Sequence, residues 1–194
     1  GLPAVLKTRR WGYDGKGQAL LRNVEDVDAA WARLSSQPLI LEEFVNLRRE
    51  LAILGVRGRG GREVFYDVTQ TEHVAGILRT ARAPADATPA LRAQAIDYSR
   101  QLLDHLNYVG VLALELFDPG DGRLLASEIA PRVHNSGHWT IDGAVTSQFE
   151  NHLRAILGWE LGDAATRGAA AMLNLIGEAP PIAALTALPW AKVH

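Results

Sequence analysis

The sequence predicts an α+β protein in which antiparallel hairpins pack against helices. One hairpin is indicated by two strand-like runs, residues 109–117 and 123–129, on either side of the turn sequence Asp-Pro-Gly-Asp-Gly. A second is indicated by residues 50–58 and 63–69, which flank Arg-Gly-Gly-Arg. Between the hairpins, Thr88 and Pro89 begin a helix, because proline is favoured at the first helical position. Its apolar stripe, typical of a helix that covers a sheet, consists of Leu91, Ala95, Tyr98, Leu102 and Leu106.

The remaining elements follow from caps, breakers and periodicity. Asn23 can cap a helix that extends to Ser35, and Thr146 or Ser147 begins another that Gly158 ends. The side chains that these two helices would bury are Val24, Val27, Trp31 and Leu34 in the first and Phe149, Leu153, Ile156 and Leu157 in the second. Strands are expected at residues 4–8, 38–45 and 170–176, and a polar loop at residues 70–78.

The composition limits the possible function classes. With 194 residues, of which 47% are hydrophobic, the chain can form one substantial domain or two small subdomains that share a cleft. A net charge of −2 argues against nucleic-acid binding, and the absence of cysteine excludes disulfides and thiolate catalysis. No apolar run approaches the roughly 18 residues of a membrane span, and the start is not a signal peptide. We therefore expect a soluble, cytoplasmic protein with neither nucleic acid nor a membrane as partner.

Residues 128–140 (EIAPRVHNSGHWT) combine a carboxylate, an arginine, two histidines, an asparagine, a serine and a threonine. A fold does not require this density of donors, acceptors and titrating groups in one loop. The segment is typical of a site that binds a polar, anionic ligand.

Two acids, Glu115 and Glu128, lie in opposite strands of the first hairpin. If its loop has four residues, Asp118 pairs with Arg123 and Glu115 faces Ala126, so the acids are diagonal neighbours on one face, roughly 7–8 Å apart. This register leaves Ala113, Ala126 and Ala130 beside the acids and sends Leu112, Leu114, Leu116, Leu125 and Ile129 to the other face. Two carboxylates with small neighbours suit Mg²⁺, and the alternative is a hairpin with two solvated acids.

The glycine-rich segment 9–18 (RRWGYDGKGQ) follows a strand that carries Lys7. Its glycines allow the backbone to approach a ligand and its basic residues supply positive charge, which together indicate a phosphate clamp, although an ordinary hairpin turn explains the pattern equally well. Residues 42–45 (EEFV) end a later strand and could offer backbone groups to an adenine edge. An edge strand with solvated acids is the simpler interpretation of that segment.

In this order, the phrases KTRRWGYDGKGQ, EEFV with REL, GVLALELF and EIAPRVHNSGHWTIDGA resemble the ATP-grasp enzymes, and most specifically the N5-carboxyaminoimidazole ribonucleotide synthetases (PurK) of purine biosynthesis. The resemblance covers nearly the whole chain. It implies two α/β subdomains with mostly antiparallel sheets around an ATP cleft, at residues 1–45 and 46–177, followed by the start of a carboxy-terminal segment at 178–194. The family's amino-terminal domain and basic carboxy-terminal segment are missing, so we expect a piece of a longer enzyme with little or no turnover alone.

The resemblance also implies residue roles. The nucleotide would be bound by Lys7, Gly12, Tyr13, Asp14, Gly15, Lys16, Gly17, Gln18, Glu42, Glu43, Phe44, Val45, Glu50, His73, Ser127 and Glu128. Glu115 and Glu128 would hold Mg²⁺. The bicarbonate and aminoimidazole ribonucleotide pocket would be lined by Arg132, His134, Asn135 and Ser136. His73 without this context is interpreted as a polar loop histidine, and Ser127 stands where the family usually has the longer asparagine.

The implied reaction is an ATP-dependent carboxylation. Bicarbonate attacks the γ-phosphate of ATP to give carboxyphosphate, and the exocyclic amine of the ribonucleotide captures the carboxyl group or the CO2 released from it. Arg132 could hold two bicarbonate oxygens with its planar fork, and His134 could orient substrate or move a proton. The family resemblance further suggests a homodimer. The alternatives are another ATP-grasp ligase, such as a formate-dependent ribonucleotide transformylase, and a nucleotide-binding module without catalysis.

Overall fold

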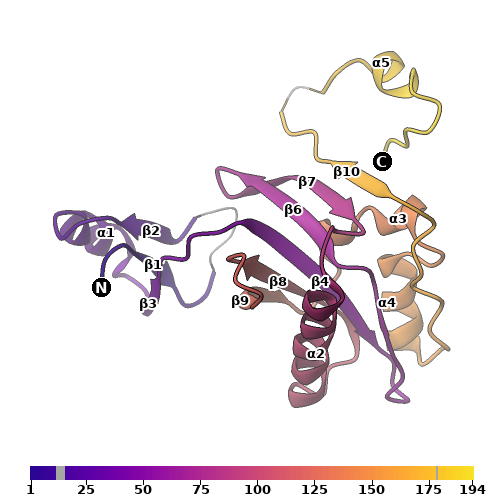
Figure 1. Ribbon diagram of the computed structural model, residues 1–194, viewed down its shortest axis with the longest axis horizontal. Helices are drawn as coiled ribbons and strands as arrows, with labels where there is room; N and C mark the ends of the chain where they lie inside the picture. The colour runs from indigo at the N-terminus through magenta and orange to yellow at the C-terminus, as the bar shows by residue number, and fades with distance from the viewer. Residues whose placement is uncertain (12–15, 178) are drawn as a thin grey trace. The chain divides into compact units, whose positions relative to one another are not determined.

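The computed structural model describes residues 1–11, 16–177 and 179–194, and these form two compact units (Figure 1). The first unit comprises Gly1–Leu47 together with His73–Ile77, and the second comprises Arg48–Glu72 and Leu78–His194. The subdomain limits expected from the sequence, after residues 45 and 177, remain predictions. The expected roles of Gly12, Tyr13, Asp14 and Gly15 lie outside the described residues.

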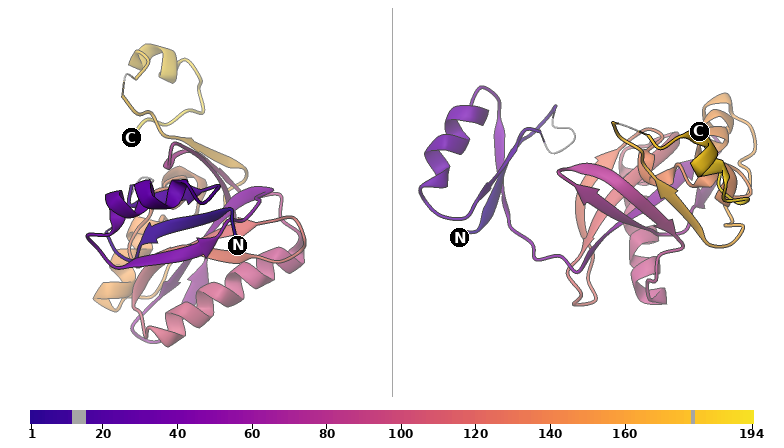
Figure 2. Two further views of the ribbon diagram at one scale, coloured as in Figure 1. Left: turned by 90° about the vertical axis from the view of Figure 1, so that its left-hand side faces the viewer. Right: turned by 90° about the horizontal axis from the view of Figure 1, so that it is seen from above.

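The first unit is a three-stranded antiparallel sheet covered by one helix. Its elements in chain order are β1 (Ala4–Thr8), β2 (Gln18–Leu21), α1 (Asp26–Leu34) and β3 (Leu39–Glu43), with β1 in the middle of the sheet. Figure 2 shows α1 lying along this sheet. The core between them is small and consists of Leu6, Leu21, Ala30 and Leu34.

Helix α1 buries a narrower face than the sequence predicts. Asn23 accepts a hydrogen bond from the backbone amide of Asp26 at 3.2 Å, as expected of a residue that helps to begin a helix. Ala30 and Leu34 are buried, whereas Val24 and Trp31 are 73% and 59% exposed. Val24 precedes the first helical turn, so it cannot belong to the buried stripe.

The second unit contains a larger sheet in the order β10-β7-β6-β4-β8-β9, with β5 paired to β4, apart from the ends of β6 and β7 that fall within His73–Ile77. The described registers, of β4 with β5, β6 and β8, of β8 with β9 and of β7 with β10, are all antiparallel. The strands are β4 (Arg49–Arg57), β5 (Glu63–Phe65), β6 (Thr69–Val74), β7 (Ile77–Ala83), β8 (Gly110–Asp118), β9 (Leu125–Ala130) and β10 (Ala170–Leu173). Residues 70–78 thus belong to a hairpin, and the prediction of a loop there was wrong.

Helices cover both faces of the larger sheet (Figure 1). Helix α2 (Pro89–His105) packs on one face, where Leu91, Ala95 and Leu103 meet Leu112 and Leu114. The other face carries the 3-10 turn η1 (Asn135–Gly137), α3 (Thr140–Gly143) and α4 (Gln148–Leu157). A short helix, α5 (Ile182–Thr186), follows and has no buried residue.

In the part of the chain that the structure describes, no helix has the length and apolar character that crossing a membrane requires.

The hairpin of β8 and β9 contains a β-bulge that changes the predicted register. Glu115 pairs directly with Glu128, whereas Leu116 pairs with Ala126, so Ser127 is the extra residue. Strand β9 begins at Leu125, and the predicted pair of Asp118 with Arg123 does not form. Because one extra residue exchanges the two faces of a strand, Leu125 lies on the face of the acids and Ala126 on the opposite face, against the prediction.

Helix α4 is oriented with a polar face inward. It buries Gln148, Asn151 and Ala155, whereas the residues predicted to be buried are 36 to 55% exposed. Those exposed residues are Phe149, Leu153, Ile156 and Leu157. The periodicity of apolar residues predicts that a helix has an apolar stripe, but it does not predict which surface the stripe contacts. In α4, hydrogen bonds determine which face of the helix is buried. Asn151 donates to the Tyr66 hydroxyl at 2.9 Å and accepts from the backbone amide of Gly162 at 2.8 Å.

His152 connects α4 to the start of β8 and makes stability sensitive to pH. Its Nδ1 accepts a hydrogen bond from the backbone amide of Val111 at 3.0 Å. Burial lowers the pKa of His152 and of His138, so both imidazoles take up protons more readily in the unfolded chain, where the pKa is about 6.5. Their contribution to stability is therefore present above about pH 6.5 and is lost as the pH falls below it.

We predict that His152→Asn makes the stability of the protein less dependent on pH. The amide oxygen of the asparagine can still accept a hydrogen bond from the Val111 amide. In thermal unfolding between about pH 7.5 and 5.5, the wild-type Tm should fall more steeply than that of the variant, by on the order of 2 °C at the acidic end. Parallel curves for the two proteins would contradict the assignment. His105→Asn, a change at an exposed histidine, serves as the control.

Candidate active site

Two carboxylates face each other on the sheet surface that α4 also covers. Glu115 in β8 and Glu128 in β9 are directly paired, which places their Cβ atoms about 4.5–5.5 Å apart. The Glu115 side chain is 21% exposed and Glu128 is exposed, so a cation can reach both from solvent. Like charges directly opposite one another are unfavourable without such a cation.

Two carboxylate ligands suit Mg²⁺ better than they suit a metal ion whose coordination shell the protein fills completely. Among the described residues, no group of three or more His, Cys, Asp or Glu side chains could hold a metal ion. Magnesium commonly takes one or two carboxylates and completes its shell with water and substrate phosphate oxygens. The pair of Glu115 and Glu128 supplies two such ligands and leaves the remaining positions to a substrate.

The segment after β9 brings His134 to the same place. The ring is buried, with Nε2 3.7 Å from Oε1 of Glu115 and Nδ1 2.9 Å from Oγ of Ser136. Nδ1 also accepts from the backbone amide of Ser136 at 3.4 Å, which favours the tautomer with the ring hydrogen on Nε2, the nitrogen nearer Glu115. The structure thus joins Glu115, Glu128, His134 and Ser136 in one site.

Two further residues of this segment are available to a ligand. Arg132 is exposed, and its guanidinium makes a hydrogen bond of 3.0 Å to the backbone carbonyl of Val133. Oδ1 of Asn135 is buried and accepts no hydrogen bond from any described residue. Because buried polar atoms are nearly always satisfied, this oxygen calls for a donor that the described residues do not supply.

The first unit carries Lys7, Lys16, Gly17, Gln18 and Glu42, which are among the residues predicted to contact the nucleotide. Nζ of Lys7 lies 2.6 Å from Oε2 of Glu42, and Lys7 pairs with Gln18 across the sheet. The Thr8 amide donates a hydrogen bond of 2.8 Å to the carbonyl of Gly17, which has a φ of +77°. Lys16 beside it is exposed.

The other predicted nucleotide residues lie at strand ends or within strands. Strand β3 ends at Glu43, and Phe44 and Val45 follow it outside regular structure, as expected of a strand that continues into a linker. Glu50 lies in β4, and His73 lies in β6 rather than in a loop. Ser127 is the bulge residue. The nucleotide contacts of all these residues remain predictions.

The structure also identifies a residue that the sequence did not reveal. Gln148, at the start of α4, is fully buried and bonds to the backbone of His134 through both ends of its amide. A glutamine at the start of a helix is not a recognised sequence signature of a functional site. Gln148 also lies 14 positions after His134, too far for a local sequence pattern to connect them.

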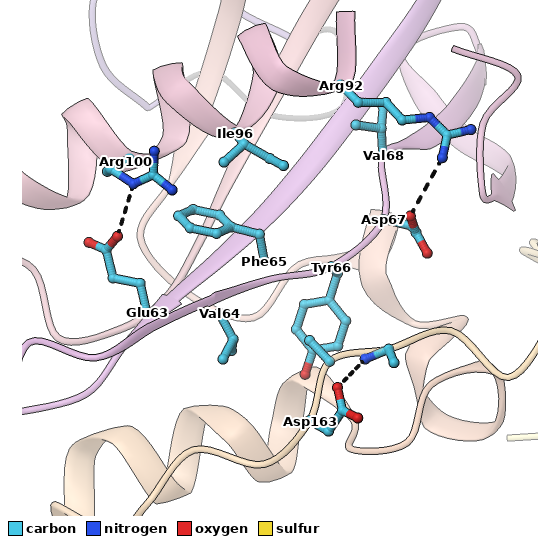
Figure 3. Close-up of a pocket in the computed structure, with 12 residues that line it drawn as sticks. Glu63, Val64, Phe65, Tyr66, Asp67, Val68, Arg92, Ile96, Arg100 and Asp163 are labelled. Carbon is cyan, nitrogen blue, oxygen red and sulfur yellow. Dashed lines mark hydrogen bonds and ion pairs between the residues drawn. The ribbon is translucent and has the colours of Figure 1, made fainter. Parts of the chain in front are cut away.

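A pocket of about 540 Å³ lies elsewhere in the second unit (Figure 3). Figure 3 shows Phe65 and Ile96 between two arginines, each next to an acid. Arg100 lies 3.4 Å from Glu63, and Arg92 lies 3.9 Å from Asp67. Among the residues that the structure describes, none of those predicted for the site lines this pocket.

The ATP-grasp domain family matches residues 1–149, and the chain therefore belongs to the ATP-grasp family. Within it, the chain is similar over its full length to the N5-carboxyaminoimidazole ribonucleotide synthase of Pseudomonas aeruginosa, with 53% identity, and to that of Vibrio cholerae, with 45%. It covers 53% and 52% of these relatives, so the chain spans about half of their length.

Solved structures give the same result. The synthetase of Thermus thermophilus matches with a TM-score of 0.90 at 53% identity, covering 97% of this chain and 51% of that one. The synthase of Aspergillus clavatus, crystallised with ADP and 5-aminoimidazole ribonucleotide, matches with a TM-score of 0.84 at 31% identity, covering 97% of this chain and 50% of that one. The resemblance and fold class predicted from the sequence are thereby confirmed.

Proposed function

We propose that this chain carries the ATP-binding and carboxylating core of an N5-carboxyaminoimidazole ribonucleotide synthetase. The observation that carries the proposal is the pair of Glu115 and Glu128 beside residues 134–137, which we call the His134 loop. The chain resembles such synthetases over its whole length. The Aspergillus relative binds ADP and the ribonucleotide, which supports both as ligands here. Bicarbonate as the third substrate, a homodimeric assembly and a cytoplasmic location are parts of the same proposal.

The proposed reaction has two steps. A bicarbonate oxygen attacks the γ-phosphorus of ATP, the bond to the β-phosphate oxygen breaks, and carboxyphosphate and ADP result. The exocyclic amine of the ribonucleotide then attacks the carboxyl carbon, the bond to the phosphate oxygen breaks, and inorganic phosphate leaves as the amine loses a proton. Magnesium, when bound, would neutralise charge on the phosphate oxygens during the first step.

The residues of the chain act mainly by positioning and charge. Arg132, exposed in the segment that follows β9, can hold two oxygens of bicarbonate or of the carboxyl group with its planar fork. The buried Oδ1 of Asn135 can accept a hydrogen bond from a substrate amine or hydroxyl group. Phosphoryl transfer requires little covalent participation from the protein, which agrees with a chain that has no cysteine.

ADP release by the full-length product of the gene tests the proposal. Mg²⁺-ATP and bicarbonate are supplied with and without aminoimidazole ribonucleotide. Release that depends on the ribonucleotide would support the carboxylating ligase. Release indifferent to the ribonucleotide would assign another substrate, and ATP binding without any release would favour a nucleotide-binding module.

Lys7→Met is expected to weaken Mg²⁺-ADP binding roughly 10-fold, because a charge-assisted hydrogen bond to a phosphate is lost. In the wild type, Nζ of Lys7 also lies 2.6 Å from Oε2 of Glu42, and the variant loses this ion pair as well. Isothermal titration calorimetry measures the change, and Lys192→Met, which alters a lysine of the carboxy-terminal segment, is the matched control. Equal affinities for wild type and Lys7→Met would remove Lys7 from the phosphate site.

A further inference from the structure

Gln148 holds the backbone of His134 from both sides. The His134 amide donates to Oε1 of Gln148 at 3.0 Å, and Nε2 of Gln148 donates to the His134 carbonyl at 2.6 Å. Gln148 is fully buried, so neither bond competes with water. The side-chain amide thus pairs with one residue's N–H and C=O as a neighbouring strand would. Removing it would leave the buried His134 N–H unsatisfied and would leave the carbonyl with one donor, the Gly137 amide at 3.0 Å.

A second connection fixes the other end of the same loop. The backbone amide of Gln148 donates to Oγ1 of Thr140 at 3.0 Å, and that hydroxyl donates to the Gly137 carbonyl at 2.6 Å. Thr140 is also fully buried. The first residue of α4 therefore determines the position of residues 134 to 137 at both ends.

The shape of this loop determines the direction of the His134 ring. The amide and hydroxyl of Ser136 both lie at Nδ1, at 3.4 and 2.9 Å, and leave Nε2 directed at Oε1 of Glu115. Displacement of the loop would change the ring's tautomer and its distance from that carboxylate.

We propose that Gln148 is a positioning residue, which fixes the His134 loop so that Nε2 faces Glu115 and holds this carboxylate in place as a ligand for Mg²⁺. The metal role rests on the proposed function; the orientation of His134 does not. Groups that orient the ligands of a metal typically change its affinity about 10- to 100-fold when they are removed.

The first experiment measures the tautomer of the His134 ring and does not require an active enzyme. The protein is labelled with ¹⁵N-histidine, and the His134 ring signals are assigned by their loss in His134→Asn. The wild type should give the signals of one tautomer, with the hydrogen on Nε2. Gln148→Met, which keeps length but removes both hydrogen bonds, should give averaged tautomers, and unchanged His134 signals in the folded variant would overturn the proposal.

The second experiment measures the magnesium requirement by the thermal stabilisation that Mg²⁺ confers in the presence of ADP. Gln148→Met should raise the concentration for half-maximal stabilisation about 10-fold or more. A purely structural role would lower Tm without changing this requirement, and that result would reject the metal part of the proposal. A wild type that shows no Mg²⁺ response would instead count against the proposed function, because the ¹⁵N spectra decide the orientation separately.

Two further variants complete the design. Gln101→Met makes the same change at an exposed glutamine of α2, and neither measurement should respond to it. Gln148→Glu retains an acceptor for the His134 amide but not the donor to its carbonyl. A carboxylate oxygen would then face the His134 carbonyl in place of the donor, so Gln148→Glu should also give averaged tautomers, and it decides the question if Gln148→Met does not fold.

Discussion

Glu128→Gln is expected to lower ribonucleotide-dependent ADP release by at least about 100-fold, because a neutral amide is a poor ligand for a hard cation at the point where phosphate charge develops. Its direct partner Glu115 would remain as the single carboxylate of the pair. Steady-state ADP release in saturating Mg²⁺-ATP and bicarbonate measures the effect.

The stability of the same variant separates a functional role from a structural one. Removing one of two facing negative charges should leave the Tm without Mg²⁺ unchanged or slightly raised. Glu160→Gln, at an exposed acid paired with Arg62, is the matched control and should retain full activity. A Glu128→Gln protein that keeps the wild-type rate would exclude this residue from the metal site.

Gly137→Ala is expected to lower the free energy of unfolding by about 1–3 kcal/mol through overpacking. A Cβ at this position would lie 2.4 Å from Cδ2 of Leu54 and 3.0 Å from the amide carbon of Gln148. Leu54 is fully buried and Gln148 is held by its hydrogen bonds to His134, so neither can easily move away. Urea denaturation followed by circular dichroism measures the loss.

Gly60→Ala is the matched control for this prediction. Its Cβ would meet no heavy atom within 4 Å, and the change should stay within about 0.5 kcal/mol. Similar stabilities for the two alanine variants would show that the core beside the His134 loop can relax around a methyl group. ADP release by Gly137→Ala should also fall, since the loop can accommodate the methyl group only by shifting.

Local rules predicted much of the fold from the sequence. β1 has the predicted bounds, and Thr88 caps α2 by accepting from the amide of Leu91 at 3.2 Å. These features depend on residues within a few positions of one another, where caps and alternation are informative. The bulge at Ser127 was missed because an inserted residue leaves no mark in an apolar pattern.

The candidate site was only partly predictable. That Glu115 and Glu128 share a face follows from strand alternation, and the structure places them closer than the predicted diagonal. The orientation of α4 could not be predicted, because it depends on hydrogen bonds between distant residues such as Asn151 and Tyr66. Gln148 was missed for the same reason.

The bulge at Ser127 has a consequence for how this hairpin tolerates changes in length. The pairing of Glu128 with Glu115 is fixed by the ladder on one side of the bulge, whereas the turn lies on its other side. The bulge already accommodates one extra residue, so the loss of a residue on the turn side can be compensated by removal of the bulge, without moving the acids. An insertion between Glu128 and His134 has no such buffer and would separate the carboxylate pair from its histidine.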